Sequence, residues 1–239
     1  MADAEKLVDE LKLLEDDYKP RGQAAETISQ VTLVELIGGF CAGKTTVISR
    51  VTELDPGFSN PCGFTTREKR PGDPKEYRMI PHDSANLSVI LEKVHAGELV
   101  QFAVHPTTVN VYGTEPQDYK TPYAILDTLY SVVHSLGRLG FNKTVPIALV
   151  TAPDAYLAQI KQRYPDTMSP VFKKRVQEAI LSQSWCLEHA DEILWSENYH
   201  GQPSKTAADV ISIAKSDNPK TEKLDHMAIA MLKSLVNLS

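Results

Sequence analysis

Mostly apolar runs of residues alternate with helical patterns along much of the chain. The apolar runs are short, contain many β-branched side chains and cover residues 31–37, 124–126, 145–150 and 192–195. Runs of this kind are typical of strands that are buried on both faces of a sheet. Apolar residues spaced for one face of a helix cover residues 129–138, 153–163 and 171–188. The alternation predicts a parallel sheet with helices on both faces.

The pattern changes between residues 60 and 115. Shorter strand-like pieces lie there at residues 99–104 and 109–112, and one helical pattern covers residues 84–96. Short strands next to a single helix indicate a second, smaller sheet. We therefore expect a small α+β subdomain inserted over residues 60–115.

Both ends of the chain carry helical patterns outside this core. Leu7, Leu11 and Leu14 share one helical face before Pro20 ends the pattern, and a second apolar face runs through residues 224–235. We expect an N-terminal helical extension over residues 1–30, a core domain over residues 31–216 and a C-terminal helix over residues 217–239. The N-terminal helix is expected to cap the domain, while a homodimer contact through the terminal helices and a mobile tail stay open as alternatives.

Composition changes this picture little. The chain has 239 residues, of which 42% are hydrophobic and 23% charged, and this suits one well-buried α/β domain. Its formal net charge of -6 argues against a general nucleic-acid-binding surface. The sequence opens without a basic segment followed by an apolar run, and its apolar runs are too short to span a bilayer. We expect a cytoplasmic protein that binds neither nucleic acid nor a membrane, with its 3 cysteines as free thiols.

The segment Gly38-Gly39-Phe40-Cys41-Ala42-Gly43-Lys44-Thr45 matches the P-loop pattern and lies between a predicted strand and a predicted helix. Glycines are needed there because backbone N–H groups must turn inward around phosphate oxygens. Lys44 would neutralise the β- and γ-phosphates of ATP, and the Thr45 hydroxyl would coordinate Mg²⁺. We therefore predict an ATP site formed by Gly38, Gly39, Ala42, Gly43, Lys44, Thr45 and Thr46.

Asp127 follows the apolar run Tyr123-Ala124-Ile125-Leu126, so its carboxylate is expected at the carboxyl end of a neighbouring parallel strand. Open α/β sheets bind their ligands at this edge. Asp127 is therefore a candidate to hold Mg²⁺ through water. The alternative is that Asp127 caps the helix that follows.

Further motifs follow the P-loop in sequence order. The first reads Thr65-Thr66-Arg67-Glu68-Lys69-Arg70-Pro71-Gly72-Asp73 and is followed by Glu76-Tyr77. The others occupy residues 97–103, 112–114, 125–127, 152–153 and 174–176. Together with the P-loop, these segments resemble the guanylate kinase family over residues 31–215.

The resemblance implies an α/β P-loop NTPase fold of three layers with a parallel central sheet. It also implies that residues 60–115 form the acceptor-binding subdomain and that a helical lid lies at residues 160–180. The activity implied is phosphoryl transfer from ATP, with Mg²⁺, to a nucleoside monophosphate, for which GMP or dGMP is the family default. Small-molecule nucleotides are then the expected partners.

The family's phosphate-binding positions fall on cationic and phenolic residues of this chain. Those implied to grip the acceptor phosphate are Arg67, Arg70, Tyr77 and Tyr112. Guanidinium forks and phenol hydroxyls suit a phosphate dianion. Arg163 and Arg175 correspond to lid arginines, whose charge would offset the negative charge that spreads over the transferring phosphoryl group. With Lys44, they are the implied catalytic residues.

The base-reading positions depart from the family pattern. A glutamate, a serine and an aspartate of the family fall here on Gln101, Gly63 and Leu129, and Thr114 completes the implied base pocket. A carboxylate only accepts hydrogen bonds, whereas an amide also donates. Gln101 therefore satisfies only part of the all-donor edge of guanine, whereas it can pair with the mixed donor and acceptor edges of adenine, cytosine or thymine. The sequence leaves the base open.

Two other functions are compatible with these motifs. One is a guanylate-kinase-like binding module, in which the acceptor site docks a protein or phosphopeptide. The other is a P-loop kinase of a phosphorylated metabolite, which would share the phosphate contacts and none of the base contacts. Lys44, Thr45 and Arg175 favour an enzyme, and the altered base pocket favours a module.

Overall fold

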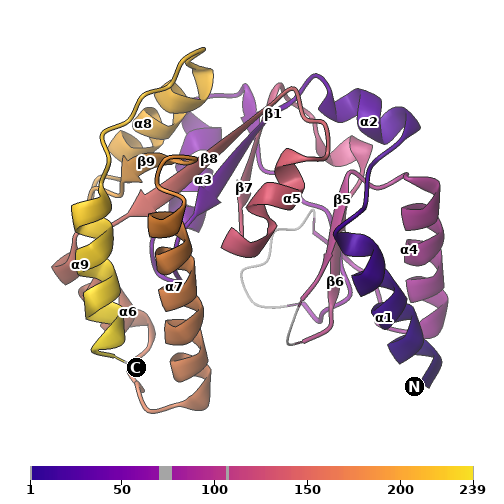
Figure 1. Ribbon diagram of the computed structural model, residues 1–239, viewed down its shortest axis with the longest axis horizontal. Helices are drawn as coiled ribbons and strands as arrows, with labels where there is room; N and C mark the ends of the chain where they lie inside the picture. The colour runs from indigo at the N-terminus through magenta and orange to yellow at the C-terminus, as the bar shows by residue number, and fades with distance from the viewer. Residues whose placement is uncertain (1, 70–76, 106–107, 239) are drawn as a thin grey trace. The chain divides into compact units, whose positions relative to one another are not determined.

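The computed structural model describes residues 2–69, 77–105 and 108–238 (Figure 1). Within them, spatial contacts define two compact units. The first unit comprises Met1–Thr32, Ser59–Ala124 and His134–Lys143, and the second comprises Leu33–Phe58, Ile125–Val133 and Thr144–Ser239. The domain boundaries expected from the sequence stay predictions.

The larger sheet has five parallel strands in the order β2-β7-β1-β8-β9. They are β2 (Phe58–Ser59), β7 (Tyr123–Asp127), β1 (Thr32–Ile37), β8 (Lys143–Val150) and β9 (Leu194–Glu197). The apolar runs therefore form the strands that they predict, and the central strand β1 is buried at every position. The run at 192–195 predicted the last strand slightly early, because the Glu192 N–H donates to the His189 carbonyl in a turn before β9.

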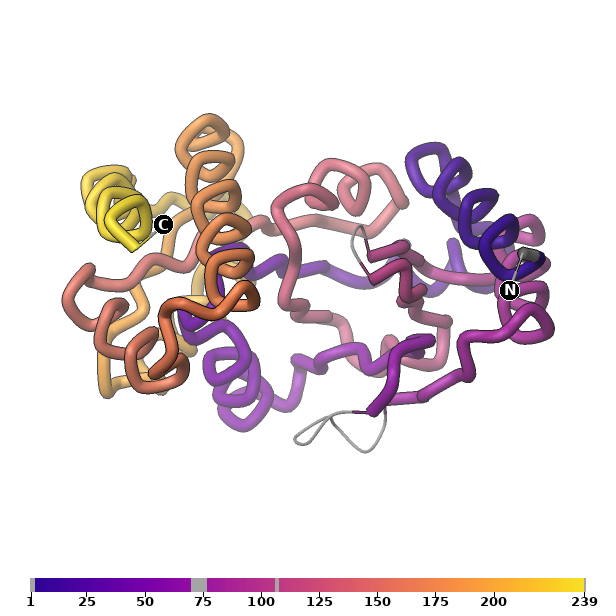
Figure 2. The backbone as a smooth tube through the Cα atoms, turned by 90° about the horizontal axis from the view of Figure 1, so that it is seen from below, coloured from indigo at the N-terminus to yellow at the C-terminus, as the bar shows by residue number. Residues whose placement is uncertain are grey.

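Helices cover both faces of this sheet. α3 (Lys44–Leu54) packs against α8 (Pro203–Lys215) on one face, while α7 (Pro170–Glu188) packs against α9 (Asp225–Val236) on the other (Figures 1 and 2). α6 (Pro153–Arg163) also contacts α9. The apolar side chains of α6, α7 and α9 form one core with the sheet, and this core includes Ile37, Tyr156, Phe172 and Met231. The layers of helix, sheet and helix confirm the predicted α/β fold with a parallel central sheet.

The helices predicted at 153–163, 171–188 and 224–235 are α6, α7 and α9. Two of these helices start at known N-terminal signals. A proline is the first residue of α6, and the Ser169 hydroxyl accepts the Phe172 N–H as the N-cap of α7. The helical segment predicted over 129–138 is also present, divided into two short helices. They are η2 (Tyr130–Val132) and α5 (Val133–Gly137), and turns at Arg138 and Leu139 end the segment.

The smaller sheet belongs to the first unit and has the strand order β4-β3-β6-β5. Its strands are β4 (Arg78–Met79), β3 (Phe64–Thr65), β6 (Val111–Thr114) and β5 (Gln101–Val104). α4 (Ser84–Ala96) spans the residues predicted for it, starts at the Asp83 cap and ends at Gly97, which adopts φ +75. Leu87, Ile90 and Phe102 are buried in one core with the N-terminal helix.

The N-terminal residues form α1 (Ala2–Glu15) and α2 (Gly22–Ile28). α1 contacts α4 and β5 through Val8 and Leu11, both of which are buried. Among the described residues, no helix combines the length and the apolar character that spanning a bilayer requires.

Glu35 is an unusual residue for the middle of a central strand. It lies in β1, its side chain is 0% exposed, and neither of its carboxylate oxygens has a hydrogen-bond partner among the described residues. Burial raises the pKa of this carboxyl from 4.5 to about 8. Glu35 is therefore held in its neutral, protonated form at pH 7.

Candidate functional site

Residues 38–45, which we call the phosphate loop, connect the end of β1 to the first turn of α3. Gly43 adopts φ +87 there, and a Cβ on it would lie 2.5 Å from Asn198 Nδ2. A Cβ on Gly39 would lie 2.7 Å from the Tyr156 hydroxyl. Only glycine fits at these two points, so the loop has the close-packed backbone that turns N–H groups toward a phosphate.

Two side chains that the sequence did not single out support the phosphate loop. The buried Tyr156 on α6 donates its hydroxyl to the Phe40 carbonyl at 2.9 Å. Asn198, which follows β9, donates Nδ2 to the Ala42 carbonyl at 2.9 Å and to Thr151 Oγ1 at 3.4 Å. Because both residues lie more than a hundred positions from the loop, no local pattern could have connected them with it.

The Lys44 ammonium lies over the phosphate loop. It donates to the Gly38 carbonyl at 2.5 Å and to the Gly39 carbonyl at 3.0 Å, and it lies 3.5 Å from Asp127 Oδ1. The Lys44 side chain is 11% exposed, whereas that of Asp127 is 49% exposed. A lysine held this way is a fixed positive charge at the N-terminus of α3, where the helix dipole also favours an anion.

Asp127 is the last residue of β7, as the sequence predicts. The alternative in which it caps the following helix does not hold, because Leu129 is the N-cap of η2 and no side chain caps it. Thr45 and Thr46 are exposed in the first turn of α3. A hydroxyl and a carboxylate are hard oxygen donors, so Thr45 and Asp127 fit the ligand chemistry of Mg²⁺.

The two lid arginines lie in different surroundings. Arg163 is the last residue of α6, and its guanidinium hydrogen-bonds the Cys41 thiol of the phosphate loop. Burial raises the pKa of Cys41, and the Arg163 charge opposes this effect. Arg175 lies on α7 and pairs with Glu178 at 3.0 Å on the same helix. The structure thus brings Arg163 to the phosphate loop, while Arg175 pairs with a neighbour one turn away.

Three of the four predicted acceptor-phosphate residues lie among the described residues of the first unit. The Arg67 guanidinium is 5.6 Å from the centroid of the Tyr77 ring, and its Nη1 donates to the Glu68 carbonyl at 2.8 Å. Tyr112 lies on β6 in register with Thr65 of β3. Arg70 lies outside the described residues. Arg67 and Tyr77 are therefore in contact, and Tyr112 shares the small sheet with the strand that leads to Arg67.

The base-reading residues are divided between the units. Gln101 and Thr114 face each other across β5 and β6, and the buried Thr114 hydroxyl is 3.0 Å from that of Tyr119. No side chain among the described residues hydrogen-bonds the Gln101 amide, which is half-buried. Gly63 packs directly against the backbone of Gly113, so a Cβ on Gly63 would overlap the Gly113 carbonyl oxygen. Leu129 belongs to the second unit and is 56% exposed.

A charged network that the sequence did not reveal ties three parts of the first unit together. Arg78 donates Nη1 and Nη2 to the two oxygens of Asp118 at 2.6 and 2.9 Å, and Nη2 also donates to Glu115 at 2.8 Å. Lys93 on α4 donates to the other oxygen of Glu115 at 2.5 Å. Bidentate pairing with Asp118 raises the pKa of Arg78. The network holds β4, which follows Tyr77, against the turn that follows β6.

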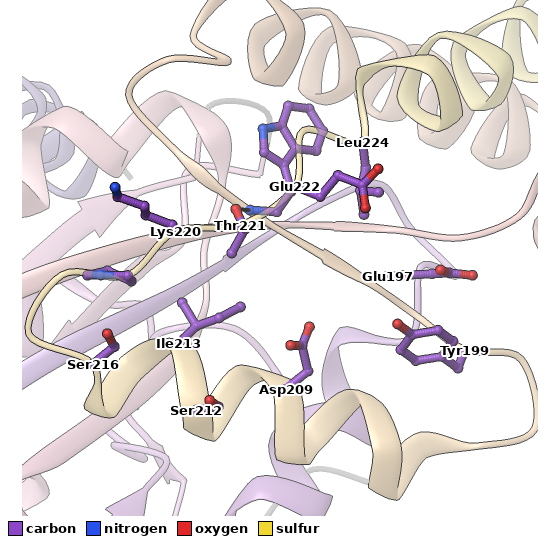
Figure 3. A pocket seen from close by; sticks show the side chains of 12 residues that line it. Glu197, Tyr199, Asp209, Ser212, Ile213, Ser216, Lys220, Thr221, Glu222 and Leu224 are labelled. Atoms are coloured by element: carbon purple, nitrogen blue, oxygen red, sulfur yellow. Dashed lines mark hydrogen bonds between the residues drawn. The ribbon is translucent and has the colours of Figure 1, made fainter.

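The second unit also contains a cavity of about 340 Å³ between β9, α8 and the segment that leads to α9 (Figure 3). Figure 3 shows Asp209 and Ser212 on α8 and Ser216 just after it, with Glu197 at the end of β9 and Tyr199 just beyond. The other lining residues are Trp195, Ile213, Pro219, Lys220, Thr221, Glu222 and Leu224. None of the candidate residues of the sequence lines this cavity, so it is separate from the phosphate loop.

Comparisons with known proteins add little to this geometry. No family model and no curated protein sequence matches the chain. Among solved structures, 65 chains match, and one is the guanylate kinase from Anaplasma phagocytophilum. That structure has 14% sequence identity and a TM-score of 0.48, and the match covers 82% of this chain and 89% of that chain. At this identity and TM-score the match carries no information on activity. The structure itself shows an α/β fold with a parallel central sheet, a glycine-rich loop between β1 and α3 and an acidic residue at the end of β7.

Proposed function

We propose that this protein transfers the γ-phosphate of ATP to the phosphate of a nucleoside monophosphate, in the manner of guanylate kinases. The observation that carries the proposal is the ion pair of Lys44 with Asp127 at 3.5 Å beside a glycine-rich loop. This pair sets a phosphate-binding cation next to a carboxylate that suits Mg²⁺. Arg163 in contact with the same loop supplies a further cation.

On the donor side, the backbone of Gly38, Gly39, Ala42 and Gly43 would surround the phosphates, with Thr45 and Thr46 at the start of α3. Thr45 and, through water, Asp127 would hold Mg²⁺, which would offset negative charge on the phosphates. Lys44 would then exchange its bonds to the loop carbonyls for bonds to phosphate oxygens. Its charge would be desolvated and fixed, which increases its effect on the reacting group.

On the acceptor side, Arg67, Tyr77 and Tyr112 would hold the monophosphate, together with Arg70 as the sequence implies. An oxygen of the acceptor phosphate would form a bond to the γ-phosphorus while the bond to the bridging oxygen of ATP breaks, which releases ADP. The negative charge that spreads over the equatorial oxygens would be offset by Lys44, Arg163 and Arg175. No strong general base is required for this step.

The acceptor base stays the open part of the proposal, with GMP or dGMP as the family default. The Gln101 amide offers one donor and one acceptor, so it suits a mixed edge better than the all-donor edge of guanine. Thr114 is engaged by Tyr119, and Gly63 offers no side chain. An unpaired buried donor costs about 1–3 kcal/mol, so Gln101 would weaken guanine selectivity by roughly one to two decades.

The test is ADP formation by the purified full-length chain with ATP, Mg²⁺ and a panel of ribo- and deoxynucleoside monophosphates, to which phosphorylated non-nucleotides are added. We expect turnover with at least one monophosphate. Lys44→Met is expected to lower kcat by roughly two to three decades, because it removes one charge-stabilising donor. Lys12→Met, at an exposed lysine paired with Asp9, is the control and keeps full activity. Absence of turnover with the whole panel, at concentrations where the protein binds ATP, contradicts the proposal.

The second candidate is a binding module that docks a phosphopeptide at the acceptor site. The close packing of Gly63 against the Gly113 backbone favours the binding module, because the base-reading side chain of the family has no room there. A module binds phosphopeptide without ATP and loses this binding in Arg67→Ala. A chain that fails the monophosphate panel and passes this test is a module.

A further inference from the structure

The N-terminal helix is part of the core of the small sheet. Val8 and Leu11 of α1 are buried in one cluster with Leu87 and Ile90 of α4 and Phe102 of β5. Both Figure 1 and Figure 2 show α1 alongside α4. Removing these side chains from water is the main stabilising contribution of α1. The helix therefore covers the sheet that carries Gln101.

β5 is an edge strand of this sheet, and the N-terminal segment caps its free edge. Glu15 Oε2 accepts the Val104 N–H at 3.2 Å, and the Tyr18 hydroxyl donates to the Leu99 carbonyl at 2.5 Å. Edge-strand peptide groups that lack a neighbouring strand otherwise need water or a side chain. Two side chains from one short segment thus provide hydrogen bonds to an N–H and a carbonyl along β5 and the residues just before it.

The two contacts bracket Gln101. Leu99 lies just before it and Val104 just after it in the same strand segment, so both ends of the segment are fixed to the N-terminal residues. The Tyr18 ring also packs edge-on against Phe102, with the ring centroids 5.0 Å apart. Because side chains alternate along a strand, Phe102 faces the core and Gln101 faces the other side.

A third contact fixes the segment where it leaves Tyr18. The Arg21 N–H donates to the Gly97 carbonyl at 2.8 Å, and a Cβ on Gly97 would meet the Arg21 side chain at 2.8 Å. Gly97 ends α4, and residues 98–100 connect it to β5. Residues 15–21 therefore contact the chain before, within and at the end of the segment that holds Gln101.

We propose that residues 15–21 brace β5 and that Glu15 and Tyr18 are positioning residues for recognition of the acceptor base by Gln101. The inference rests on the proposed function, in which the Gln101 amide contacts the base. Recognition of a base edge by one amide depends on placement to within a fraction of an ångström, and an unbraced edge strand does not provide it.

The experiment measures steady-state kinetics of the full-length chain with its best monophosphate. Tyr18→Phe keeps the ring contact with Phe102 and removes only the bond to Leu99. Glu15→Ala removes the acceptor for the Val104 N–H, and Glu15→Gln restores an oxygen that accepts it. We expect Tyr18→Phe and Glu15→Ala to raise the acceptor KM by roughly three- to tenfold, with kcat and the ATP KM unchanged, and Glu15→Gln to recover the wild-type KM.

Glu10→Ala is the matched control, because Glu10 lies on the same helix and pairs with the exposed His95 of α4 rather than with a peptide group of β5. A merely structural role would move the acceptor KM and the ATP KM together, and this result overturns the inference. An unchanged acceptor KM in active Tyr18→Phe and Glu15→Ala also overturns it and leaves the proposed function intact. A wild-type chain that turns over no monophosphate overturns both.

Discussion

The Asn198 side-chain amide donates to the carbonyl oxygen of Ala42 at 2.9 Å and so ties the end of β9 to the phosphate loop. The same amide nitrogen lies 3.4 Å from Thr151 Oγ1, at the end of β8. Asn198 is buried, and the loop passes close enough that a Cβ on Gly43 would meet its nitrogen. The conformation of the loop therefore depends on a residue that is distant in sequence.

Replacing this amide should weaken ATP binding. Asn198→Ala leaves the Ala42 carbonyl without its donor, and we expect a loss of stability of about 1–3 kcal/mol and a rise of roughly tenfold in the ATP KM. Asn198→Asp should be worse, because it sets a carboxylate against a carbonyl. Asn237→Ala, at the exposed C-cap of α9, is the control. Urea denaturation and ATP titration check both effects, and an ATP KM within twofold of wild type would contradict the assigned role.

Arg78 should stabilise the first unit, as Asn198 stabilises the phosphate loop. Arg78→Gln leaves the buried Asp118 without its bidentate partner, so we expect a loss of about 1–3 kcal/mol in the free energy of unfolding. The acceptor KM should rise with it, because Tyr77 directly precedes Arg78. The control is Arg50→Gln, since Arg50 pairs with Glu53 on the exposed face of α3 and should change stability by less than about 0.5 kcal/mol. Equal stability losses in the two variants, measured by urea denaturation, would refute this account.

Local signals explain what the sequence predicted well. The run at 31–37 forms β1, glycine spacing located the phosphate loop, and Asp127 ends β7 as expected. In each case the pattern and its structural cause lie within a few residues of one another. The strand order then brought Lys44 and Asp127 together without further information from the sequence.

The sequence could not predict contacts between distant side chains, such as those of Asn198, Tyr156 and Arg78. α8 was also not predicted, although its pattern is local. Its buried face consists of Thr206, Ala207, Val210, Ile213 and Ala214. These positions recur at helical spacing, so the sequence does carry an amphipathic signal for α8, whose buried face packs against α3.

The buried Glu35 predicts a stability that falls as the pH rises. The pKa of its carboxyl is about 8 in the folded chain and 4.5 when the side chain is exposed to water, so between these values the folded state keeps a proton that the unfolded state has released. Stability from this group is therefore full below pH 4.5 and is lost progressively up to about pH 8. The total effect is on the order of several kcal/mol.

Two variants test this assignment by urea denaturation between pH 5 and pH 9. Glu35→Gln cannot ionise, so the difference in unfolding free energy between wild type and variant should shrink or reverse as the pH rises, by at most about 1.4 kcal/mol per pH unit. Glu53→Gln is the control, because Glu53 is exposed and its pKa is lowered by Arg50 rather than raised. An identical pH profile for wild type and Glu35→Gln would show that Glu35 does not titrate in this range.

Gly63 should resist replacement by the serine that the family carries at this position. A Cβ on Gly63 would overlap the Gly113 carbonyl oxygen and lie 2.8 Å from Thr114 Cγ2, so both Gly63→Ala and Gly63→Ser should destabilise the first unit by about 1–3 kcal/mol or more. Gly57→Ala is the matched control, because its nearest neighbour is a side-chain oxygen of Asp55 at 3.0 Å, which can move. Thermal unfolding measures the stability, and turnover of GMP by Gly63→Ser measures base reading. The serine side chain has to displace the backbone before its hydroxyl reaches a base, so we expect no gain in GMP turnover. A stable variant with improved GMP turnover would contradict this, because it would show that the backbone of Gly63 and Gly113 moves apart.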